Sequence, residues 1–334
     1  EYIKKQQEEE SMAGILTALV SGGAGALFWM WIAALFGMAT KYAEGVLAIK
    51  YRTIDENGHV LGGPFYYIEN GMGKNWRWLG KIFAFFGAGV GLLGIGTFTQ
   101  VNGITAAAGN FFDQNREHVI NLFGNDYSIA VVVTGILLTI CVALVVLGGI
   151  QRIASVSSVI VPFMAVFYII ACIAILVLNA ARIPAAFAEI IQSAFGLRAA
   201  AGGALGAVLI AMQKGIARGI FSNEAGLGSA PIAAAAAQTN EPARQGLVTM
   251  TGTFIDTIIV CTMTGLCIVL TGSHTAGLEG VAVTTRAFQM GLPVPAQFSA
   301  FLLMMCLIFF AFTTIIGWNY YGERCLEYLS NGSH

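Results

Sequence analysis

Lys214 to Arg244 read KGIARGIFSNEAGLGSAPIAAAAAQTNEPAR, and this stretch decides how the rest of the chain is interpreted. It begins as an apolar segment and becomes rich in Gly, Ser, Asn and Glu where a membrane helix would continue. Unpaired backbone groups are costly in hydrocarbon, so such a break survives only where protein or a water-filled cavity surrounds it. Many secondary transporters form their solute and ion sites from broken helices near the bilayer midplane. The stretch therefore predicts a solute carrier.

The composition is typical of a polytopic membrane protein. Of the 334 residues, 57% are hydrophobic and 10% are charged, whereas soluble domains carry roughly 25% charged residues. The formal net charge of -1 predicts no nucleic-acid partner. The six cysteines lie mostly in apolar runs without a CxxC pair, which indicates small buried residues rather than disulfides or metal ligands. The sequence lacks GxSxG, HExxH and Walker-type motifs, which argues against an enzyme and against an ATP-driven pump.

Apolar runs of roughly 20 residues, the length that crosses a bilayer, predict an all-α bundle of membrane helices. The chain opens with a polar segment, EYIKKQQEEE, in which we find no cleavable signal peptide. Shorter pieces at 11–23, 62–73 and 183–196 suit a partial helix, an interfacial or re-entrant element and an amphipathic surface helix. The predicted spans are 24–51, 78–111, 127–147, 157–180, the broken span 200–230, 248–272 and 296–321.

The distribution of lysine and arginine predicts the orientation, because short cytoplasmic loops carry an excess of positive charge. One loop, after the second element, collects most of these residues and is predicted to be cytoplasmic. The residues assigned to that loop are Lys41, Lys50, Arg52, Lys74, Arg77 and Lys81, with Arg152, Arg244 and Arg324 on the same side and Arg116, Arg182, Arg198 and Arg286 on the other.

Ionisable residues inside the predicted spans are few, and such residues are functional candidates because they are costly in lipid. Lys214, Arg218, Glu224 and Asp256 stand out. For the two cations, a structural ion pair or a side chain that reaches the interface is an equal alternative. Asp256 is expected to point into the bundle, because it shares a polar face with Thr249, Thr253 and Thr257.

Glycines serve two purposes in the predicted spans. A stripe in one span favours close packing between helices. Gly219, Gly226 and Gly228 instead bracket polar residues, which indicates an unwound segment whose free N–H and C=O groups bind solute or Na⁺. Gly219, Ser222 and Asn223 are therefore candidate substrate-binding residues. The packing stripe consists of Gly87, Gly89, Gly91, Gly94 and Gly96.

Two further polar spots lie inside apolar runs. The buried amide of Gln100 needs a hydrogen-bond partner, either a neighbouring helix or a polar solute. Thr313 and Thr314 either bond back to the preceding helical turn or supply the hydroxyl oxygens of a Na⁺ site. Trp318 lies one turn beyond Thr314 and either lines a small pocket or belongs to an interfacial aromatic belt.

Several long stretches resemble the alanine or glycine:cation symporter family, also called sodium:alanine symporters. The resemblance covers nearly the whole chain from about 12 to 329. It is carried by GIFSNEAGLGSAPIAAAAAQTNEPARQGLVTMTGTFIDTIIVCTMTGL (219–266), GGAGALFWMWIAALFGMATKYAEGVLAIKYR (22–52), GGPFYYIENGMG (62–73) and FFAFTTIIGWNYYGERC (309–325).

The resemblance implies a leucine-transporter-like fold of inverted repeats and cell-membrane uptake of alanine or glycine. Transport would be coupled to Na⁺, sometimes to H⁺, without a cofactor. By position, Gln100, Phe221 and Trp318 match residues that surround the amino acid in this family, and Thr313 and Thr314 match its sodium-site hydroxyls. The implied division is a polar segment at 1–10, most of the first repeat at 11–198, part of the second at 199–329 and a tail at 330–334.

The chain departs from the family pattern near both ends. Family members carry a Gly-Thr-Gly-Asn stretch just before a segment that resembles Met12-Ala13-Gly14, whereas Glu8-Glu9-Glu10-Ser11 stands here. Carboxylates there would repel the carboxylate of an amino acid, and the backbone freedom of glycine is absent. Further core helices are also expected after Leu329. The sequence thus favours a symporter by descent and leaves open a truncated or engineered scaffold that does not transport. A channel is disfavoured, because charged rings and filter repeats are lacking.

Overall fold

The computed structural model of the chain describes residues 18–55, 58–113, 117–122, 124–196, 203–278 and 280–330. Within these residues, seven helical stretches are long and apolar enough to cross a bilayer. This confirms the predicted all-α, multi-pass membrane architecture. The division into inverted repeats stays a prediction, and the carboxylates of Glu8, Glu9 and Glu10 lie outside the described residues. The seven stretches are Ala26–Lys50, Lys74–Phe112, Ile129–Val146, Gln151–Leu178, Ala204–Asn223, Pro242–Leu270 and Ala296–Leu329.

The first half of the described chain combines long helices with two short antiparallel hairpins. Thr53 pairs with Leu61 in the first hairpin, and Val119 pairs with Ser128 in the second. The elements are α3 (Ala26–Lys50), β1 (Thr53–Ile54), β2 (Val60–Leu61), α4 (Pro64–Met72), α5 (Arg77–Leu92), α6 (Ile95–Phe112), β3 (Val119–Leu122), β4 (Asn125–Ser128), α7 (Ile129–Val146), α8 (Gly149–Leu178) and α9 (Ile183–Ala194).

The second half contains two interrupted helices. One is broken between α10 and α11, and the other contains a π-helical turn at Phe254–Cys261 between α12 and α13. The elements are α10 (Ala204–Asn223), α11 (Ala230–Ala235), α12 (Pro242–Thr253), α13 (Thr262–Leu270), α14 (Val281–Gly291) and α15 (Ala296–Leu329).

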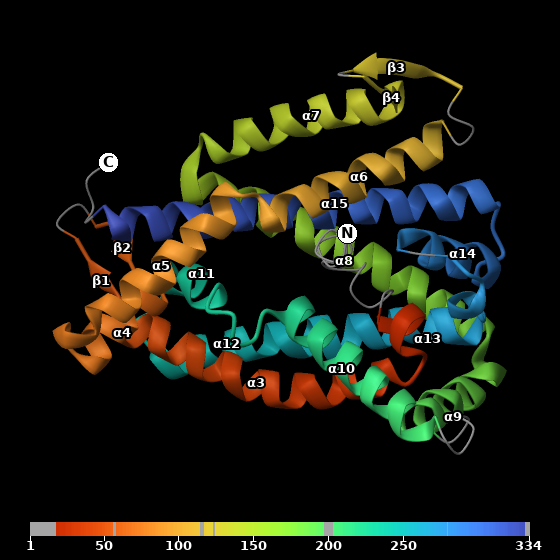
Figure 1. Cartoon of the computed structure of the whole chain (residues 1–334), viewed down its shortest axis with the longest axis horizontal. Helices are drawn as coiled ribbons and strands as arrows, with labels where there is room; N and C mark the ends of the chain where they lie inside the picture. Colours follow the sequence, from red (N-terminus) through yellow and green to blue (C-terminus); the bar gives the residue numbers. More distant parts are fainter. Residues whose placement is uncertain are drawn as a thin grey trace.

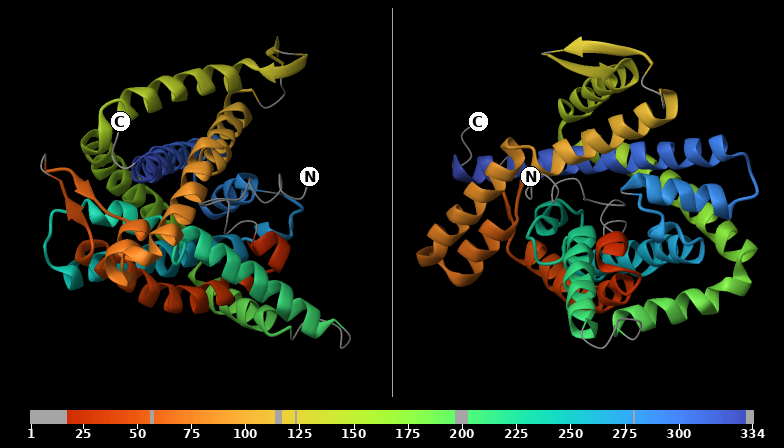
Figure 2. Two further views of the ribbon diagram at one scale, coloured as in Figure 1. Left: turned by 60° about the vertical axis from the view of Figure 1, so that its left-hand side comes forward. Right: turned by 45° about the vertical axis from the view of Figure 1, so that its right-hand side comes forward.

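The helices form two packed groups (Figure 1). In one group, α3 packs against α10, α11 and α12. In the other, α15 runs the length of the molecule and packs against α5, α6, α7 and α8. The turned views keep the α3 group and the α15 group on opposite sides (Figure 2). A site between these groups can therefore draw residues from both.

Each end of α15 is anchored in its own apolar core. The first core joins α3, α8, α13 and α14 to the first half of α15 around Phe288, which is fully buried. The second joins α4, α5, α6 and α7 to the second half of α15 around Phe65, also fully buried. Many other large apolar side chains on α7 and α8 are exposed, as expected for helices that face lipid.

The boundaries differ from the sequence prediction in several places. The span predicted at 78–111 is two helices, because Gly94 adopts a left-handed conformation (φ 64°) between α5 and α6. The hairpin β3–β4 and the helix α14 were not predicted, since both are short and lack a full apolar run. The last helix continues to Leu329, eight residues beyond the predicted end at Tyr321. The piece at 183–196 is helical as predicted and buries Ala186, Ile190 and Ala194.

One end of the bundle gathers several of the positive residues used to predict orientation. Arg52 donates hydrogen bonds to the backbone carbonyls of Ala235 and Ala237, at 2.6 and 2.7 Å. Arg77 pairs with Glu69 of α4 at 3.4 Å. Lys41 is an exception and corrects the prediction, because it lies inside α3 and is only 7% exposed. The cytoplasmic assignment of this end remains a prediction.

Candidate functional site

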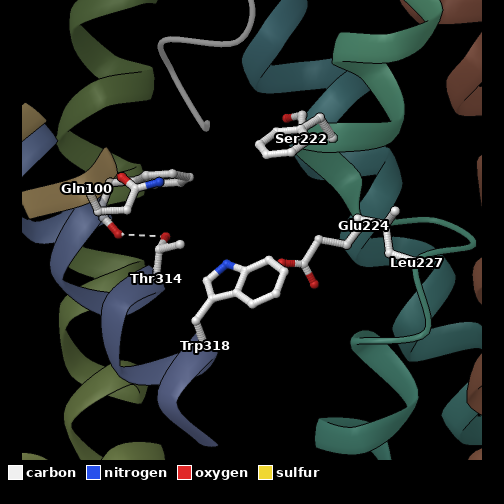
Figure 3. Close-up of a pocket in the computed structure, with 8 residues that line it drawn as sticks. Gln100, Ser222, Glu224, Leu227, Thr314 and Trp318 are labelled. Atoms are coloured by element: carbon white, nitrogen blue, oxygen red, sulfur yellow. Dashed lines mark hydrogen bonds between the residues drawn. The ribbon is translucent and has the colours of Figure 1, made fainter. Parts of the chain in front are cut away.

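A small pocket opens between the two helix groups, next to the break after α10 (Figure 3). Its volume is about 60 Å³, several times the roughly 10–15 Å³ that a cavity needs to hold one water molecule. Gln100, Thr314 and Trp318 reach it from one side, and Ser222, Glu224 and Leu227 come from the other. The full lining is Gln100, Phe221, Ser222, Glu224, Leu227, Phe310, Thr314 and Trp318.

The break after α10 is held open by an unusual backbone conformation. Glu224 has a left-handed backbone (φ 55°), which is unfavourable by about 1–2 kcal/mol for a residue with a side chain. Its carboxylate accepts a hydrogen bond from the Ser229 hydroxyl at 2.7 Å. Gly226 and Gly228 follow with φ of 83° and 78°. α10 therefore ends beside the pocket, and its last carbonyls carry partial negative charge there.

Gln100 and Trp318 form the opposite wall. Gln100 on α6 is 4% exposed and lines the pocket. Trp318 on α15 packs edge-to-face with Tyr321, with ring centroids 5.6 Å apart. The Trp318 ring also lies directly over Gly96, where a Cβ atom would approach ring atoms to 2.6 Å. This glycine is what allows the tryptophan to reach the pocket.

The two threonines on α15 bond back to their own helix. Thr313 and Thr314 both donate to the Phe310 carbonyl, at 2.8 and 3.1 Å. A hydroxyl that donates its proton keeps oxygen lone pairs, so neither bond prevents the oxygen from contacting a cation. Thr314 lines the pocket, whereas Thr313 does not.

Behind the pocket lies a polar cluster around Asp256. The hydroxyls of Ser222 and Thr257 donate to one carboxylate oxygen of Asp256, at 2.7 and 2.9 Å. The Asn223 amide donates to the Thr257 hydroxyl at 3.1 Å and accepts from the Ala225 backbone at 3.0 Å. Asp256 thus points into the bundle and is connected through hydrogen bonds to the end of α10.

Not every residue singled out from the sequence reaches the pocket. Gly219 instead lets α10 pack against α3, since a Cβ there would lie 3.2 Å from the side chain of Ala33. Asn223 is buried and holds the break through its hydrogen bonds. Arg218 is 7% exposed, and its guanidinium lies 6.0 Å from the centre of the Phe221 ring. Thr249 bonds back to Gln245 rather than joining Asp256.

Other residues near the site escaped the sequence analysis. Leu227 and Phe310 line the pocket but look like ordinary apolar residues in the sequence. Lys41 and Glu44 are both 7% exposed, and Glu44 accepts a hydrogen bond from the Gly226 backbone at 3.2 Å. The sequence does contain a signal for them, because Lys41 and Glu44 are two ionisable residues inside the apolar run that forms α3. The prediction that Lys41 lies in a loop hid this signal.

Comparison with known proteins places this sequence in a family. The sodium:alanine symporter family matches residues 9–334. An uncharacterised transporter of Haemophilus influenzae is 55% identical over 321 residues, covering 96% of this chain and 66% of the relative. A sodium/alanine symporter of Methanococcus maripaludis is 48% identical over 325 residues, covering 96% and 67%. A probable sodium/glutamine symporter of Bacillus subtilis is 38% identical over 322 residues, covering 96% and 62%.

These relatives are transporters rather than enzymes, and the chain spans about two thirds of their length. The match extends over both helix groups and over every residue that lines the pocket. The family suggested by the sequence motifs is thereby confirmed: this chain belongs to the sodium:alanine symporter family.

Proposed function

We propose that the chain carries out sodium-coupled uptake of a small neutral amino acid, alanine or glycine, across the cell membrane. The observation that carries this proposal is the pocket at the end of α10, lined by Gln100, Phe221 and Trp318. The pocket lies between the α3 group and the α15 group, so a relative motion of the two groups would open it to one side of the membrane or the other. Family membership supports coupling to Na⁺.

The chemistry of the lining suits a small zwitterion. The C-terminal end of α10 presents partial negative charge to the ammonium group of a solute. The Gln100 amide offers both a donor and acceptors to a polar group. Phe221 and Trp318 restrict the room left for a side chain, which favours alanine or glycine over glutamine. The comparison with glutamine is relevant because one relative is named as a probable sodium/glutamine symporter.

Na⁺ is expected to bind as cargo at Thr313 and Thr314, with backbone carbonyls of the broken helix nearby. Hard cations prefer oxygen ligands, and hydroxyl and carbonyl oxygens are what these positions supply. The roles of both threonines, and of Gly219, Ser222 and Asn223 in solute binding, are part of the proposal.

Uptake into proteoliposomes tests the function. With an inward Na⁺ gradient, labelled alanine is expected to accumulate, and unlabelled glycine is expected to compete better than glutamine. Replacing Na⁺ with choline should abolish accumulation, and uptake that persists in choline would disprove Na⁺ coupling. Calorimetry without any heat from alanine or glycine in Na⁺ would favour the scaffold that does not transport.

A threonine variant tests the Na⁺ site. Thr314→Val keeps the side-chain shape but removes the hydroxyl oxygen. Contacts to charged groups are worth about 1.5–3 kcal/mol, so the Na⁺ concentration for half-maximal uptake should rise about tenfold or more. Thr139→Val is the matched control, because Thr139 on α7 also bonds back to its own helix but is exposed away from the pocket. Equal Na⁺ dependence in both variants would remove Thr314 from the site.

A further inference from the structure

Asp256 is an ionisable residue in a membrane-spanning helix, and its surroundings show a specific arrangement. It lies in the π-helical turn Phe254–Cys261, which interrupts the regular bonding between α12 and α13. π-helical turns are rare and occur frequently at functional sites. A carboxylate at membrane depth is costly and is retained where it pairs or transfers protons. Two independent features therefore single out the same turn.

The hydrogen bonds around Asp256 all run toward its carboxylate. Ser222 and Thr257 both donate to the same oxygen, at 2.7 and 2.9 Å. Thr257 can donate there because its own oxygen accepts from the Asn223 amide at 3.1 Å. Protonation of this carboxylate oxygen would place a new O–H opposite two hydroxyl donors, so at least one hydroxyl must turn around. Ser222 has a second partner, because its hydroxyl also lies 3.6 Å from the Cys261 sulfur, so its hydroxyl can be the one that turns.

Ser222 links this carboxylate to the solute. It lines the pocket and belongs to the last turn of α10. While its proton is donated to ionised Asp256, its lone pairs are available to an ammonium group in the pocket. If Asp256 is neutral and donates to Ser222, one of the two lone pairs of Ser222 is occupied and its proton points elsewhere, so the oxygen is a poorer acceptor for the ammonium group. An ionised Asp256 therefore favours the ammonium end of an amino acid.

The charged residues near Asp256 carry more negative than positive charge, which favours binding of a proton. The charges of Glu224, Glu44 and Asp256 all act on the ammonium of Lys41 in α3, so three carboxylates share the influence of one lysine. The charged and titratable groups that face Asp256 itself are Lys41 from α3, Glu224 after α10 and the Cys261 thiol of its own turn. Surplus buried charge is costly, so binding a proton at one carboxylate relieves it. Within the described residues, no three His, Cys, Asp or Glu side chains converge closely enough to hold a metal ion.

We propose that Asp256 is a proton-binding site that opposes solute binding through Ser222. With the pocket empty, Asp256 holds a proton on its carboxylate. When an amino acid binds, that O–H bond breaks, the proton passes to the water displaced from the pocket, and Ser222 donates to the restored carboxylate. Solute and proton therefore compete. This inference rests on the proposed function, because it needs an amino acid in the pocket.

Calorimetry on the purified chain in detergent tests the competition. Alanine is titrated in Na⁺ at several pH values and in two buffers of different ionisation enthalpy, which reports protons released per alanine bound. Alanine binding should release protons. The affinity for alanine should fall about fivefold or more from about pH 8 to about pH 5, because about fivefold is the lower end of the usual coupling between two binding sites. Asp256→Asn should release no proton and show an affinity independent of pH.

Two further variants distinguish the role of the Ser222 hydroxyl from that of the Asp256 carboxylate. Ser222→Ala leaves Asp256 in place but removes the connecting hydroxyl, so it should lose most of the pH dependence. Glu241→Gln, an exposed carboxylate at the start of α12, should behave as the unaltered chain. Alanine binding that releases no proton and keeps one affinity across the pH range would overturn the proposal and leave the proposed function standing. No alanine binding at any pH would instead overturn the proposed function.

Discussion

Gly96 and Trp318 show how one absent side chain shapes the pocket. Trp318 lies over Gly96 so closely that a Cβ atom would approach its ring to 2.6 Å. A large aromatic ring bordered by a helix backbone can move only into the pocket or away from α6. The shape of the pocket therefore depends on a residue that does not line it.

Gly96→Ala is expected to weaken alanine binding by displacing Trp318. Overpacking of this kind costs about 1–3 kcal/mol, so alanine affinity should fall by up to about 150-fold if the whole cost falls on the bound state. Calorimetric titration with alanine measures the change. Gly103→Ala is the matched control in the same helix, because a Cβ there would meet nothing within 4 Å. If both variants bind alanine equally well, Trp318 is not positioned by Gly96.

Two of the long helices meet closely where glycines face each other. α5 and α15 approach at Gly91 and Gly322, where a Cβ on Gly91 would lie 2.8 Å from the Cα of Gly322. Membrane helices gain little from burying apolar surface against one another, so they rely on such close backbone contacts. The glycine stripe predicted from the sequence thus contains positions of unequal importance.

Gly91→Ala is expected to lower the midpoint of thermal unfolding, because the added methyl group forces α5 away from α15. The cost should be about 1–3 kcal/mol. Gly89→Ala, two residues earlier in the same helix, has no atom within 4 Å of the added group. It should be neutral or slightly stabilising, since alanine is favoured over glycine in helices by about 1 kcal/mol. Melting curves of both variants in one detergent give the comparison, and identical curves would contradict this account of the crossing.

At the scale of the whole molecule, an ionic cluster ties the loop after α3 to the end of α15. Arg324 bonds to Glu327 at 2.6 Å and to the His59 ring at 2.6 Å. His59 in turn lies 3.4 Å from the Glu327 carboxylate. Tyr328 donates to Glu69 of α4 at 2.8 Å. Segments more than 250 residues apart in the sequence are joined here.

Arg324→Ala is expected to destabilise the chain strongly, because it leaves the Glu327 carboxylate, 5% exposed, without its main partner. Removing one member of a buried ion pair costs about 3–5 kcal/mol. Glu323→Gln removes the other carboxylate bound by Arg324, but that side chain is 47% exposed and its loss should cost less than about 1 kcal/mol. Thermal unfolding compares the two. A mild effect of Arg324→Ala would show that the cluster does not hold this end together.

The sequence by itself determined the class of protein, the family and the approximate position of most spans. Apolar runs long enough to cross a bilayer leave the backbone little choice but a helix, so α3, α7, α8 and α10 were predictable. The polar stretch after Phe221 marked the helix break for the same reason. Long motifs then identified the family and pointed to Gln100, Phe221, Trp318 and Thr314, which all line the pocket, although their roles remain proposals.

Only the tertiary structure decided which polar residues meet. Lys41, Glu44, Glu224 and Asp256 are separated by up to 215 residues, and no local pattern predicts that the three carboxylates act on one lysine. The left-handed Glu224 and the π-helical turn are also invisible in the sequence, because local preferences oppose both. Long-range packing of α3 against α10 and α12 overrides those preferences and brings the buried charges together.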